Sequence, residues 1–147
     1  MNTTLVTETP ASIGSYRHRT YLIGAAATAV AVGGTLWAVL KGGTSDKSQL
    51  DSLVYVAGAA LIVGIVLFSW LVPARIAHCG TGLPFALVSI PLLYAFWSGI
   101  PILVGVAAIL IGAAHRASGA PKRGRALAAI LVGTVVALLT LAAVLFG

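Results

Sequence analysis

Four residues of this 147-residue chain carry an imidazole or thiol group, which can bind a metal or act as a nucleophile or base. They are the three histidines and the single cysteine, His18, His78, His115 and Cys79. Imidazole and thiolate are ligands that Zn²⁺ prefers, but the spacing of these residues matches no known ligand pattern. One cysteine forms neither a CxxC pair nor an internal disulfide. We therefore expect no metal site and no cofactor.

Catalysis by a nucleophile, a base and an acid would require a carboxylate near a histidine. The chain has three carboxylate side chains, Glu8, Asp46 and Asp51. Glu8 lies in a polar N-terminal stretch, and the two aspartates fall in a loop predicted to face the side opposite every histidine. No charged residue lies inside an apolar run, whereas proton- and cation-coupled transporters generally place one there. The sequence predicts neither an enzyme nor a coupled pump.

The apolar runs indicate that the chain lies in a lipid bilayer. Its mean hydropathy is +1.05 and charged residues make up only 8%, far more apolar than a soluble domain. The net charge of +6 sits in short loops between the apolar runs, where the positive-inside bias and anionic headgroups explain it without nucleic acid. We expect an all-α, polytopic transmembrane helical bundle.

The number of spans depends on the uncharged stretch at residues 83–114. A single helix of that length would run roughly 48 Å, whereas a hydrocarbon core is about 30 Å thick. Gly99 suits a helix C-terminus and Pro101 suits the first turn of the next helix, so we predict a short Pro/Gly-broken hairpin. Each arm is short for a full span, and a re-entrant hairpin or a four-span chain are the alternatives.

The hairpin gives about five helices in one transmembrane domain, residues 21–147. Residues 1–20 are polar and are predicted to form a mobile cytoplasmic tail. Pro73 is expected to end the second span, because proline interrupts a helix. The predicted spans are residues 21–40, 52–72, 81–97, 100–115 and 126–146.

The distribution of basic residues predicts the orientation. With five passes and a cytoplasmic N-terminus, the inner segments hold seven lysines and arginines and the outer loops hold two, which leaves the C-terminus outside. With four passes the division is three against six and the N-terminus is forced outside. The inner seven are Arg17, Arg19, Arg75, Arg116, Lys122, Arg123 and Arg125; the outer two are Lys41 and Lys47.

Three predicted spans carry small residues four positions apart, which line one helix face and let helix backbones approach closely. These faces predict packing between helices, with other membrane subunits or with a second copy of the chain as partners. They are Ala25, Ala29 and Gly33; Ala60 and Gly64; and Ala129, Gly133 and Ala137.

The most basic segment precedes the last span and is the best candidate for contact with the phosphates of anionic lipid headgroups. The alternative is that it only fixes the topology. Its lysine and arginines are Arg116, Lys122, Arg123 and Arg125.

From residue 83 to the end, the chain resembles a family of small bacterial membrane proteins, common in actinobacteria, that form a domain of unknown function. The matching residues are Arg123, Gly124, Ala126, Ala128 and Gly133, with Gly105 and Gly112 fitting more loosely. The family usually has glycine where this chain has Lys122 and Ala129. The resemblance implies a bacterial inner (plasma) membrane and supplies no activity.

Two functions are compatible with this sequence. The first is an interaction or accessory subunit that packs through its small-residue faces. The second is a small passive permease or channel, since backbone carbonyls and small residues can line a pore. A channel predicts a continuous polar path, for which seven hydroxyl residues are available: Thr28, Thr35, Ser69, Ser89, Ser98, Thr134 and Thr140.

Overall fold

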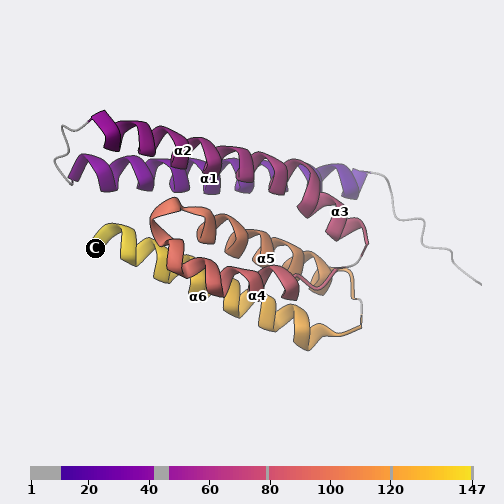
Figure 1. Cartoon of the computed structure of the whole chain (residues 1–147). Coiled ribbons are helices and arrows are strands. Elements are labelled where there is room, and N and C mark those ends of the chain that lie inside the picture. The colour runs from indigo at the N-terminus through magenta and orange to yellow at the C-terminus, as the bar shows by residue number, and fades with distance from the viewer. Residues whose placement is uncertain (1–10, 42–46, 79, 120, 147) are drawn as a thin grey trace, which may run out of the picture.

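The computed structural model describes residues 11–41, 47–78, 80–119 and 121–146, and within these residues the chain is all-helical (Figure 1). The segments α2, η1 and α3 follow one another as one rod, called the second rod below, and α4 continues into η2, which is kinked at Ala95, so the five predicted helices are confirmed. The elements are α1 (Ala11–Lys41), α2 (Lys47–Val66), the π-helical turn η1 (Leu67–Leu71), α3 (Val72–Ala77), α4 (Leu83–Leu92), the 3₁₀ segment η2 (Leu93–Ser98), α5 (Ile100–Ala117) and α6 (Arg123–Phe146).

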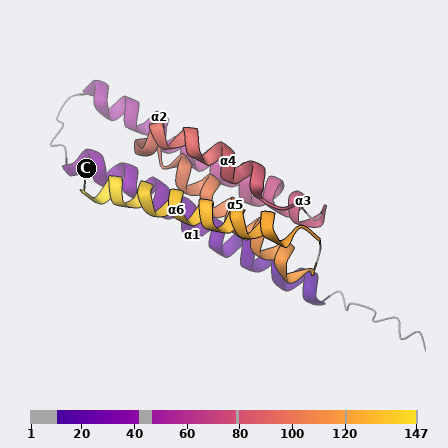
Figure 2. The same ribbon diagram turned by 90° about the horizontal axis from the view of Figure 1, so that it is seen from below.

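Four helices in the described part of the chain are long and apolar enough to cross a membrane. The helix that begins with α4 is apolar but shorter than these four. Both views place the start of α1 and the end of α6 at opposite ends of the bundle (Figure 1 and Figure 2). The spans are His18–Trp37, Asp51–Ala77, Ile100–Ala117 and Arg123–Phe146, and the shorter helix is Leu83–Ala95.

The predicted hairpin is present between η2 and α5. Gly99 has a φ of 68°, in the left-handed region that glycine tolerates, and Pro101 occupies the first turn of α5. The Ser98 hydroxyl donates to the carbonyl of Ala95 at 2.7 Å and accepts from the N–H of Ile100 at 3.3 Å. These side-chain bonds satisfy backbone groups that the turn would otherwise leave unpaired.

The first helix begins earlier than the predicted span of residues 21–40. The helix α1 begins at Ala11, so residues 11–20 are helical, while residues 1–10 lie outside the described part. Helix propagation adds one hydrogen bond for each residue fixed once a nucleus exists. The apolar span supplies that nucleus, and no proline after Pro10 interrupts the helix.

Pro73 does not end the second span, contrary to the sequence-based expectation. The rod continues through α3 to Ala77, and Pro73 lies in the first turn of α3. The preceding turn η1 is π-helical, with the N–H of Val72 donating to the carbonyl of Leu67, five residues earlier. This wider turn changes the backbone pairing just before the proline, so the missing N–H of Pro73 does not break the rod.

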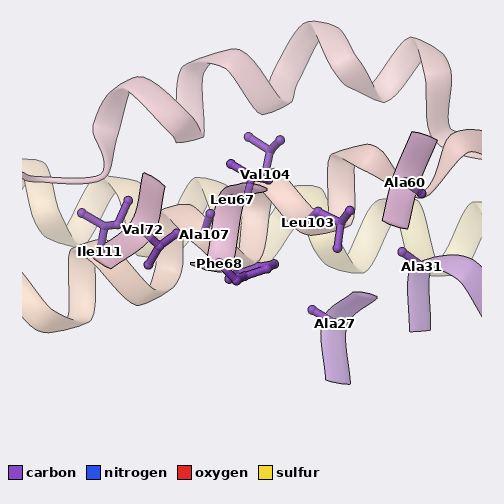
Figure 3. Packing of buried hydrophobic residues seen from close by; sticks show 10 residues of the cluster. All are labelled: Ala27, Ala31, Ala60, Leu67, Phe68, Val72, Leu103, Val104, Ala107 and Ile111. Atoms are coloured by element: carbon purple, nitrogen blue, oxygen red, sulfur yellow. The ribbon is translucent and has the colours of Figure 1, made fainter. Parts of the chain in front are cut away.

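The core is built around α5, which contacts α1, the α2–η1–α3 rod, α4 and α6. Its fully buried Leu103 and Ile111 belong to one apolar cluster with Val72 and Phe68 from the second rod (Figure 3). Ala27 and Ala31 from α1 complete this cluster and allow close approach because their side chains are small. Every other helix therefore packs against α5.

Candidate functional site

The small-residue face of α6 packs inside the molecule. A Cβ atom built on Gly133 would lie 2.6 Å from the carbonyl oxygen of Gly105 on α5, and one built on Gly105 would lie 2.8 Å from the carbonyl oxygen of Gly133. Ala129 is fully buried and Ala137 is half-buried on the same face. This face is therefore used for the contact between α5 and α6.

The small-residue face of α2 is also internal. Ala60 is fully buried, and a Cβ on Gly64 would overlap the side chain of Thr28 on α1. A Cβ on Gly24 would likewise overlap the ring of Phe68. These residues hold α1 and the second rod at close range.

The small-residue face of α1 points outward. Ala25, Ala29 and Gly33 are all exposed, and a Cβ built on Gly33 would meet no atom within 4 Å. They line an open, apolar groove of about 740 Å³ between α1 and the second rod. The other lining residues are Tyr21, Gly24, Thr28, Val32, Leu36, Leu61, Gly64, Ile65, Phe68 and Ser69.

Five hydroxyl residues, of which Thr35, Ser89 and Thr140 are buried, bond to their own helices. Each donates to a backbone carbonyl three or four residues earlier, at 2.7–2.8 Å. Such bonds satisfy the hydroxyl hydrogen without a partner on another helix. The pairs are Thr28 to Gly24, Thr35 to Ala31, Ser89 to Ala86, Thr134 to Ile130 and Thr140 to Val136.

Two of the three histidines, His115 and His78, have local structural contacts. The ring of buried His115 has its Nε2 atom 2.6 Å from the carbonyl oxygen of Pro121, which joins the end of α5 to the segment before α6. Exposed His78 has its Nδ1 atom 2.7 Å from the carbonyl oxygen of Ala74, at the end of α3. Among the described residues no cluster of three metal-binding side chains occurs, and Cys79 lies outside them.

The predicted headgroup residues lie where α5 ends and α6 begins, and all four are exposed. The same end of the bundle carries α3 and the start of α4 (Figure 1). There Arg75 from α3, Lys122 and Arg125 line a single pocket of about 250 Å³. The neighbouring Arg116 and Arg123 are not among its lining residues. The sequence did not indicate Arg75 as a headgroup residue, because it lies in α3, far along the chain from the other three.

Lys122 has an unusual backbone conformation. Its φ is 69°, which strains residues other than glycine, and its carbonyl accepts from the N–H of Arg125 at 3.0 Å. This conformation would suit a glycine.

The fold and these surfaces define the chain as a small all-helical membrane-embedded protein. No family model, curated protein or solved structure matches it. Gly105 and Gly133 make the contact between α5 and α6, so packing accounts for these two glycines.

Proposed function

We propose that the protein is an interaction or accessory subunit of a membrane that pairs with a second copy of itself through the outward face of α1. The observation that carries the proposal is the exposure of Ala25, Ala29 and Gly33, whose spacing suits close helix packing. The small-residue faces of α2 and α6 already pack against other helices of the same chain. A second copy offers an identical small-residue face, which makes a self-complementary, two-fold contact.

The groove beside this face supports the proposal. It is bounded on its other side by Leu61, Ile65 and Phe68 of the second rod, so it can receive larger side chains of the second copy. Helix association in lipid depends on packing and interhelical contacts, because lipid tails are as apolar as leucine. A groove between two helices provides more packing area than a single helix surface.

Replacing Gly33 with leucine is expected to weaken self-association roughly tenfold, because the side chain would hold the two α1 helices apart. Energy transfer between donor- and acceptor-labelled copies in liposomes, measured over a range of protein-to-lipid ratios, gives the dissociation constant. The variant should fold normally, since nothing within the chain lies within 4 Å of the new Cβ.

Gly58→Leu is the matched control. Gly58 also lies in a helix, α2, with open space at its Cβ position, but it does not line the groove. Its replacement should leave energy transfer unchanged. Equal association of the Gly33→Leu variant and the unaltered chain would contradict the proposal and would leave lipid as the occupant of the groove.

The alternative of a passive channel has less support. The hydroxyl groups that would line its path donate to their own helices, and the centre of the bundle holds apolar side chains such as Leu103 and Ile111. Ion or solute flux in proteoliposomes above that of empty liposomes would favour the channel. The proposal assigns no catalysis. Asp51, the one carboxylate side chain in the described ranges, lies near the start of α2, whereas His115 lies in the last turn of α5 at the other end of the bundle.

We further propose a bacterial inner membrane with the start of α1 on the cytoplasmic side and the end of α6 outside. The resemblance of residues 83–147 supports a bacterial source. The basic residues support the orientation: Arg75, Arg116, Lys122, Arg123 and Arg125 gather at the end where α1 starts (Figure 1). Positive residues favour the cytoplasmic side.

Cysteine labelling tests this orientation. With Cys79→Ser as the background, a cysteine replacing exposed Ser118 should resist an impermeant thiol reagent added to intact cells and react after lysis. A cysteine replacing exposed Asp51, at the other end, should react before lysis. The reverse pattern would place the basic end outside and would refute the proposed orientation.

A further inference from the structure

The pocket at the basic end of the bundle brings together cations from separate segments. Arg75 comes from the last turn of α3, Lys122 precedes α6, and Arg125 lies in its first turn. Thr81 adds a hydroxyl at the rim, and Phe85 and Ile111 add apolar surface. Three positive side chains around one cavity of about 250 Å³ fit an anionic group.

Among the residues that the structure describes, no carboxylate side chain lies at this end of the bundle. The one carboxylate side chain within the described residues, Asp51, lies near the start of α2, and α2 starts at the opposite end of the bundle (Figure 1). Like charges held close together repel unless an anion lies among them. The convergence of these cations therefore favours an anion lying among them.

The backbone around the pocket is held in place. Gly82 precedes α4 with a φ of 76°, and a Cβ there would lie 2.6 Å from the carbonyl oxygen of Ala108, so this segment rests directly on α5. The N–H of Gly80 donates to the carbonyl of Arg75 at 2.9 Å. The first turn of α4 also points N–H groups toward this side, which favours negative charge.

The position of the pocket at the end of the apolar helices favours one source of the anion. The pocket lies where α3 ends and α4 and α6 begin, at the boundary between apolar helices and polar connections (Figure 1). Lipid phosphates lie at this depth. We propose that the pocket binds the phosphate group of an anionic phospholipid, with Arg75, Lys122 and Arg125 as its ligands.

The test compares two double variants that remove equal charge from the same end of the bundle. Arg75→Gln/Arg125→Gln alters the pocket, and Arg116→Gln/Arg123→Gln alters exposed arginines outside it. Native mass spectrometry of the detergent-purified full chain counts retained phosphatidylglycerol, with phosphatidylcholine as the zwitterionic comparison. The pocket variant should retain phosphatidylglycerol roughly tenfold or more weakly than the unaltered chain, and the control should retain it normally.

Three outcomes would overturn the proposal. Equal loss in both double variants would assign retention to general surface charge, and equal retention of the two lipids by the unaltered chain would remove the preference for an anionic headgroup. Inorganic phosphate is added at increasing concentration as a separate arm. Displacement of phosphatidylglycerol by millimolar phosphate would assign the pocket to a free phosphate compound, whereas retention supports the lipid.

Discussion

Leucine in place of Gly133 is expected to lower the free energy of unfolding of the bundle by about 3 kcal/mol. The Cβ atom alone would lie 2.6 Å from the carbonyl oxygen of Gly105, and a backbone atom of a packed helix yields little. The α5–α6 contact would have to open. Unfolding in a denaturing detergent titration, followed by circular dichroism, measures the loss.

The same substitution at Gly33 is the control for this experiment. A Cβ atom there meets no atom within 4 Å, and leucine replaces glycine in a helix, so stability should stay the same or rise slightly. Similar unfolding curves for the two variants would contradict the close α5–α6 packing. Gly105→Leu should be as damaging as Gly133→Leu, and the double variant should lose less than the sum, because both changes separate the same backbones.

Alanine in place of Gly99 is expected to destabilise the protein by roughly 2–4 kcal/mol. Two effects contribute. A φ of 68° strains any residue with a Cβ, and that Cβ would lie 2.9 Å from the Cβ of Ala31 and 3.0 Å from its carbonyl oxygen. The turn that reverses the chain would be strained and pushed away from α1. Thermal unfolding in detergent measures the change.

Gly119→Ala separates the two effects. Gly119 has nearly the same φ, 69°, but open space around its Cβ position. It should lose only the strain, about 1–2 kcal/mol. If Gly99→Ala and Gly119→Ala lowered stability equally, the contact between the hairpin turn and α1 would contribute nothing.

The hairpin was predictable because its signals are local. The uncharged stretch at residues 83–114 is too long for one span, and Gly99 and Pro101 mark the reversal within it. The helix limits were less predictable. The continuation past Pro73 depends on the π-helical turn before it, and neither residue type nor spacing distinguishes that turn from ordinary helix.

The sequence could not predict which small-residue faces are buried and which are exposed. Ala60 and Gly64 have the same spacing as Ala25 and Ala29, yet the first pair is buried and the second pair is exposed. Spacing determines which residues share a helix face, whereas the arrangement of neighbouring helices determines what covers it. The pocket of Arg75, Lys122 and Arg125 could not be predicted for the same reason, since only the folded chain brings these separate segments together.

The central position of α5 has a consequence for how the protein responds to its membrane. Neighbouring helices cover most of α5, whereas the outer helices expose large apolar side chains such as Leu138 and Ile62. A thicker or thinner bilayer therefore acts first on the tilt of the outer helices. Because α5 is shielded, it experiences acyl-chain length only through the packing of its neighbours.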